Sequence, residues 1–184
     1  MCPAANDNAG VTEPQPADSH WPRYSTRRFP AYRFVPGHTP HPRRHPLGHS
    51  YRQQEERPSP FPPGEWTQST DYLYGIDLYN FAYWWESHEV FEGLWHAVGH
   101  DTEQAQCFQA LIQLAAANLK QYLTRPIAAR KLLVSGIVRL RRIPPFFMGI
   151  DVTGLMNTIL TRIDHSHFES PLIRLVKDSP TGRI

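Results

Sequence analysis

Residues 84–96, WWESHEVFEGLWH, hold the densest group of chemically active side chains in the sequence. At about 100° per residue of a helix, His88, Glu89 and Glu92 fall on one face together with Trp85. Residues four apart on a helix are neighbours, so His88 and Glu92 could reach one ion or one proton. Tryptophan is unfavourable in water, so Trp85 in the middle of this polar stripe indicates that the stripe is partly covered.

A second segment, residues 106–119, offers a partner for this face. It is apolar almost all round, as expected of a central helix, and Gln113 lies in its polar stripe. A buried glutamine needs hydrogen-bond partners. We therefore expect Gln113 to face a polar cluster made of Glu86, His88, Glu89 and Glu92.

Three kinds of chemistry fit this cluster. A divalent metal is the cofactor it could hold, but neither His-Glu-x-x-His nor Glu-x-x-His is present, so His88 and Glu92 are weak candidate ligands. Glu89 or Glu92 could instead act as a base with His88 as the acid. A structural network that fixes the angle between two helices is the third interpretation, because buried carboxylates must be paired.

The network interpretation favours a non-catalytic structural or binding module. The alternative is a metal-dependent or acid/base hydrolase that uses the same four residues, so the sequence leaves open whether the protein is an enzyme. Asn80, as a helix N-cap, and Trp85 and Trp95, beside the cluster, have predicted structural roles.

Composition divides the chain near residue 65. The first 65 residues contain 13 of the 18 prolines and five of the ten histidines, and they carry the excess of basic over acidic residues. Such a segment buries too little apolar surface to offset its ordering entropy, so we expect residues 1–65 to be a disordered Pro/His/Arg-rich arm. Docking on the core is the alternative, through the aromatic side chains of Trp21, Tyr24, Phe29, Tyr32 and Phe34.

Residues 66–184 are predicted to form one all-α domain of about five helices in an antiparallel bundle-like array. The helices are expected at residues 71–79, 82–98, 102–122 and 125–143, with a fifth beginning near residue 151. Apolar residues at i, i+3, i+4, i+7, i+8 and i+11 from Val152 form a single stripe. No segment shows sustained strand alternation.

Charge and cysteine content narrow the class of protein. The net charge is +2, and residues 66–184 carry equal numbers of acidic and basic residues, which argues against a nucleic-acid-binding domain. Two cysteines give no disulfide framework, and no run of about 18 apolar residues predicts a membrane span. With no apolar signal-peptide region, we expect a cytoplasmic protein. Its partner would be a protein or a small-molecule ligand, and a homo-oligomer is compatible with the sequence.

Two segments together resemble a known family. LYNFAYWWESHEVFEGLWHAV, followed by FQALIQLAAAN, is similar to the bacterial and archaeal domain of unknown function 309 family. The family pattern has Asn, then Glu-x-His-Glu-x-x-Glu-x-x-Trp, then a helix with Gly-Leu-Ile-Gln-Leu-Ala. The resemblance covers roughly residues 72–160 and implies an all-helical fold without an established activity. It departs at Ala110, where the family usually has Gly, and at Lys120, where many members have His.

Overall fold

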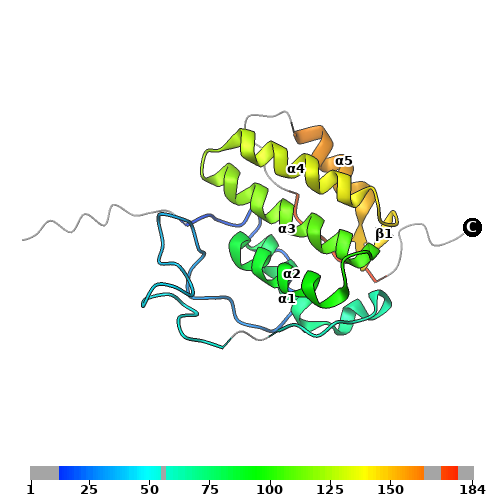
Figure 1. Ribbon diagram of the computed structural model, residues 1–184. Coiled ribbons are helices and arrows are strands. Elements are labelled where there is room, and N and C mark those ends of the chain that lie inside the picture. The colour runs from blue at the N-terminus through cyan, green and yellow to red at the C-terminus, as the bar shows by residue number, and fades with distance from the viewer. Residues whose placement is uncertain (1–12, 55–56, 164–170, 178–184) are drawn as a thin grey trace, which may run out of the picture.

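The computed structural model of the protein describes residues 13–54, 57–163 and 171–177. These residues form an array of α-helices. The elements are the 3-10 helix η1 (Pro63–Gln68), α1 (Thr70–Asn80), α2 (Trp84–Val98), α3 (Glu103–Tyr122), α4 (Pro126–Leu140) and α5 (Val152–Arg162). Each of the first four α-helices packs on the next, and α5 lies against α4 (Figure 1). The predicted all-α fold is confirmed.

Local sequence signals set most of the helix ends. The hydroxyl of Thr102 accepts a hydrogen bond from the Ala105 amide at the start of α3, and the Asp151 carboxylate accepts one from the Gly154 amide at the start of α5. Pro126 occupies the first turn of α4, where its missing N–H leaves no bond unmade. Asn80 was predicted to cap α2, and this prediction is wrong. Asn80 is the last residue of α1, and the N-cap of α2 is Tyr83, whose side chain makes no capping bond.

A small hairpin separates α4 from α5. Strands β1 (Phe146–Phe147) and β2 (Ile150–Asp151) pair antiparallel around Met148 and Gly149, both of which have positive φ. Two central residues with positive φ are typical of the tight turn that suits the twist of a hairpin. The strands are too short for an alternating pattern, so the sequence did not predict them.

The core lies where α1, α2 and α3 meet. It is built around aromatic and aliphatic side chains that are almost fully shielded from solvent, among them Tyr72, Phe91, Phe108, Leu111 and Leu114. The hairpin closes this core, because the Tyr72 hydroxyl donates to the Met148 carbonyl at 2.8 Å. None of the helices in the described ranges combines the length and the hydropathy that a membrane crossing requires.

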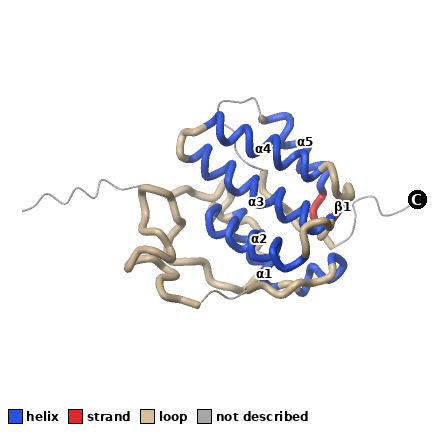
Figure 2. The backbone as a smooth tube through the Cα atoms, in the orientation of Figure 1, coloured by secondary structure: helices blue, strands red, loops and turns tan. Residues whose placement is uncertain are grey.

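Residues 13–54, which we call the arm, contain neither helix nor strand (Figure 2). They nevertheless lie along α1 and α2, where the Phe29 ring stacks on the Tyr83 ring with centroids 4.8 Å apart. This arrangement differs from the free arm expected for residues 1–65 and agrees with the docking alternative. Composition did not reveal it because the arm binds residues about 50 positions later in the chain. Residues 1–12 lie outside the described part.

Candidate functional site

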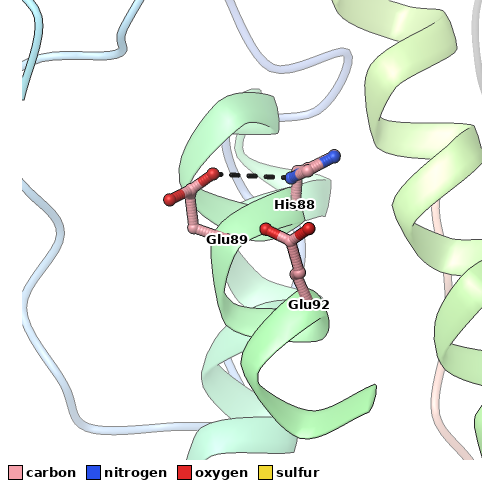
Figure 3. Close-up of side chains that lie close together, drawn as sticks. All are labelled: His88, Glu89 and Glu92. Atoms are coloured by element: carbon pink, nitrogen blue, oxygen red, sulfur yellow. Dashed lines mark ion pairs between the residues drawn. The ribbon is translucent and has the colours of Figure 1, made fainter. Parts of the chain in front are cut away.

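Three side chains of α2 meet at one place on its surface. The ligand atoms offered by His88, Glu89 and Glu92 all lie within 4.8 Å of one another. The His88 Nδ1 is 3.6 Å from the nearer Glu89 carboxylate oxygen (Figure 3). All three residues are half-buried. We call this group the α2 site.

The helix itself positions the α2 site. Residues at i and i+4 lie one turn apart on the same face, which places the Glu92 carboxylate beside the His88 ring. Glu89 approaches from the adjacent position and faces the same imidazole, as the dashed line in Figure 3 marks. The opposite face of α2 holds the site in place, because Phe91 and Leu94 are fully buried in the core.

Glu86 does not join the α2 site. Its side chain is buried beneath the arm, where one carboxylate oxygen accepts the Phe34 amide at 2.9 Å and lies 3.1 Å from the His49 Nε2. The predicted cluster of four acidic and imidazole groups is therefore divided between two places. Helical spacing sets Glu86 apart from the other three, but its partners could not be predicted because they are in a segment predicted to be disordered.

The hydrogen bond expected between Gln113 and the cluster is not made. The Gln113 side-chain oxygen is shielded from solvent and has no hydrogen-bond partner among the described residues. The His88 Nδ1 is also shielded and makes no hydrogen bond there. Each is a buried polar atom without a partner, which is destabilising.

The two predicted structural tryptophans have different surroundings. Trp85 is covered by the arm, with its ring centroid 5.0 Å from that of Phe34 and 5.5 Å from that of His41. This contact explains a tryptophan within a polar stripe. Trp95 instead stacks on His100 with centroids 4.2 Å apart and nearly parallel rings. Its indole N–H is shielded and has no acceptor among the described residues.

The hydroxyl and thiol of the helical core are not available as nucleophiles. The Ser87 hydroxyl donates to the Gly75 carbonyl at 3.0 Å inside the α1–α2 interface. Burial raises the pKa of the Cys107 thiol to about 12, which keeps it protonated at neutral pH. The chemistry of the α2 site therefore depends on its imidazole and carboxylate groups.

One buried, paired carboxylate was missed by the sequence interpretation. Asp77 is fully buried in α1, and its carboxylate accepts hydrogen bonds from the Arg23 guanidinium at 2.9 Å and from the amides of Tyr24 and Ser25. An acidic residue between Ile76 and Leu78 was the available signal, because a buried carboxylate must be paired.

Comparison with known proteins gives a family for the helical part alone. No curated protein matches the chain significantly. A family model does match residues 72–132, which run from α1 into α4 and include the α2 site. The match is narrower than the resemblance over residues 72–160, and the arm lies outside it. Residues 72–132 are thus identified as a member of the family described as Domain of unknown function (DUF309).

Proposed function

We propose that this protein is a small binding module whose α2 site holds a divalent first-row transition-metal ion. The observation that carries the proposal is the convergence of the His88, Glu89 and Glu92 ligand atoms within 4.8 Å. Imidazole nitrogen and carboxylate oxygen are common ligands of zinc, manganese and iron. Ligand distances of about 2.0–2.2 Å require these atoms to approach somewhat closer, which side-chain rotation of the two glutamates would provide.

A site of this kind supplies only part of a coordination shell. Three ligands from one helix leave positions for a further group. The shielded Gln113 oxygen of the next helix, α3, is a polar atom without a partner among the described residues. The remaining positions would take a small anionic ligand or a side chain of a partner protein. This supports a binding role, in which the ion connects the helical domain to its ligand, and we place the protein in the cytoplasm.

A metal-dependent hydrolase is the second candidate. Three protein ligands with an open position are also the arrangement by which zinc enzymes activate a bound water. Glu89 or Glu92 would then be the base in place of a ligand. Buried Ser87 and Cys107 supply no covalent nucleophile to such a reaction, so water is the nucleophile that this candidate requires.

Metal titration of the full chain, prepared without a histidine tag, tests the proposal. We expect isothermal titration with Zn²⁺ or Mn²⁺ to show one ion per chain, and His88→Ala and Glu92→Gln each to weaken binding at least tenfold. His38→Ala and Glu65→Gln are matched controls, because both residues are exposed and distant in sequence from α2. Equal affinity of His88→Ala and the native chain would assign the bound ion to other histidines and contradict the proposal.

A further inference from the structure

Three acidic residues of α1 and α2, Asp71, Asp77 and Glu86, form what we call the acidic face. Each of them faces a basic residue of the arm. The Asp71 carboxylate lies 3.1 Å from Arg27, Asp77 lies 2.9 Å from Arg23, and Glu86 lies 3.1 Å from the His49 ring. Two arginine–aspartate ion pairs and one carboxylate–imidazole contact therefore join the arm to these helices.

The acidic face also binds the main chain of the arm. Asp77 accepts the amides of Tyr24 and Ser25 at 2.8 and 2.9 Å, and Glu86 accepts the amide of Phe34 at 2.9 Å. These bonds satisfy three backbone donors of the arm without a β-sheet. Recognition of main-chain groups by fixed side chains is how protein surfaces hold extended peptides.

Two tyrosines, in α1 and at the N-cap of α2, also bind the arm. The Tyr74 hydroxyl donates to the Arg28 carbonyl at 3.0 Å, and the Tyr83 hydroxyl donates to the Pro30 carbonyl at 3.3 Å. The Arg27 and Arg33 guanidinium groups lie 4.6 and 4.5 Å from the centroids of these two rings. Such cation–π contacts favour arginine at those two positions of the peptide.

The family model matches residues that bind the arm, but it does not match the arm itself. Asp77 and Glu86 lie inside the segment that the family model matches, at residues 72–132, whereas the whole arm lies outside it. The arm has no helix or strand of its own and is held by these side-chain contacts. It thus has the properties of a ligand that is covalently attached to its own receptor.

We infer that the α1–α2 surface is a binding site for an extended cationic peptide of a partner protein, and that the arm occupies it as a tethered competitor. The partner segment carries arginine and aromatic residues at the spacing of Arg23, Tyr24, Arg27, Phe29 and Arg33. A tether gives the arm an effective concentration of about millimolar, so a free peptide binds the native chain weakly. Release of the arm would expose the site.

The test uses a fluorescent synthetic peptide of residues 20–36 as the probe and the full chain as the receptor. In one receptor variant, Arg23→Ala with Ser25→Pro, the arm loses the guanidinium and one amide that bind Asp77. The acidic face of this variant is unchanged. We expect the probe to bind the variant at least tenfold more tightly than the native chain, by fluorescence anisotropy. A probe carrying the same two changes should show no such gain.

Variants of the face complete the experiment. Asp77→Asn, added to the arm variant, should abolish probe binding. Asp71→Asn is half-exposed and leaves the core intact, so it should weaken binding severalfold without affecting folding. Equal affinity of the native chain and the arm variant for the probe would show that the arm is a fixed part of the fold and overturn the inference. A concentration-dependent dimer of the native chain, lost in the arm variant, would overturn it in favour of arm exchange between copies.

Discussion

The Cys107 thiol is fully buried in the core, and desolvation raises its pKa to about 12. The thiolate is the reactive form, so we expect Cys107 to resist thiol reagents at pH 8 in the folded protein and to react once the chain is unfolded. A Cys2→Ser variant leaves Cys107 as the one thiol, and its rate of reaction with Ellman's reagent with and without guanidinium measures the difference. Rapid reaction of the folded variant would contradict the burial.

Tyr72, also in the core, has a pKa raised well above 10.0, chiefly by burial. Its neutral form is favoured in the folded state, so this contribution to stability is complete below pH 10 and is lost as the pH rises above it. We expect the urea midpoint of the native chain to fall between pH 9 and 11. It should fall less steeply in Tyr72→Phe, which cannot ionise, although that variant is less stable at neutral pH.

Tyr51→Phe is the control for this pH dependence, since Tyr51 is in the arm and half-exposed. The slope of its urea midpoint with pH should equal that of the native chain. If Tyr72→Phe also had the native slope, the alkaline loss would have to come from other groups, such as the Cys107 thiol.

Among the elements, α1 and α2 make an unusually close approach at Gly75. A Cβ at this position would lie 2.7 Å from the Phe91 ring, and Phe91 is fully buried. Overpacking of a core destabilises by about 1–3 kcal/mol, of which a better helix propensity recovers up to about 1 kcal/mol. We therefore expect Gly75→Ala to lower the free energy of unfolding by roughly 1–2 kcal/mol, measured by chemical denaturation.

Gly64→Ala is the matched control for this close approach. A Cβ at Gly64 meets nothing within 4 Å, so its stability should remain near that of the native chain. An equal loss of unfolding free energy in the two variants would show that the loss in Gly75→Ala does not come from the close approach of α1 and α2.

Asn80 connects α1 to the segment at residues 171–177. Its side chain donates to the Ile173 carbonyl at 2.9 Å and accepts the Ile173 amide at 2.8 Å. Asn80→Ala leaves the buried Ile173 amide without a partner, although the Ile173 carbonyl keeps the Trp21 indole, and this should reduce stability by about 1–3 kcal/mol. The control is Asn157→Ala, because Asn157 is an exposed residue of α5. Equilibrium urea unfolding of the two variants measures the difference in stability.

The helices could be predicted because their signals are local. A capping residue, an apolar stripe and a terminal proline placed α3, α4 and α5 close to their observed bounds. The role of Asn80 is not local, since its partner Ile173 is 93 positions away. The β1–β2 hairpin depends on positive φ at Met148, which a methionine in the sequence does not indicate.

At the scale of the whole molecule, the residues of the α2 site could be predicted in part from the sequence. Helical spacing predicted that His88 and Glu92 would be adjacent, and they are, with Glu89 beside them. The predicted cluster also included Glu86, which binds the arm instead. Docking of the arm could not be predicted from its charged and aromatic residues alone. The surface that binds them forms only after α1 and α2 pack.

Removal of the arm should therefore destabilise the whole domain. A chain that begins at residue 57 loses the partners of Asp77 and Glu86 and exposes the rings of Tyr83 and Trp85. A loss of about 1 kcal/mol lowers Tm by roughly 2–4 °C in a chain of this size, so we expect a fall of at least about 5 °C by calorimetry. An unchanged Tm would show that the arm contributes nothing to folding.

The segment at residues 171–177 also meets the arm. The Trp21 indole donates to the Ile173 carbonyl at 3.3 Å, and the Leu175 amide donates to the Tyr24 hydroxyl at 2.9 Å. These contacts join residues about 150 positions apart, so they form only after nearly the entire polypeptide has left the ribosome. The arm's bonds to α1 and α2 join residues only about 50 positions apart, so the arm can cover the α1–α2 surface early in translation, and residues 171–177 fasten it there only later.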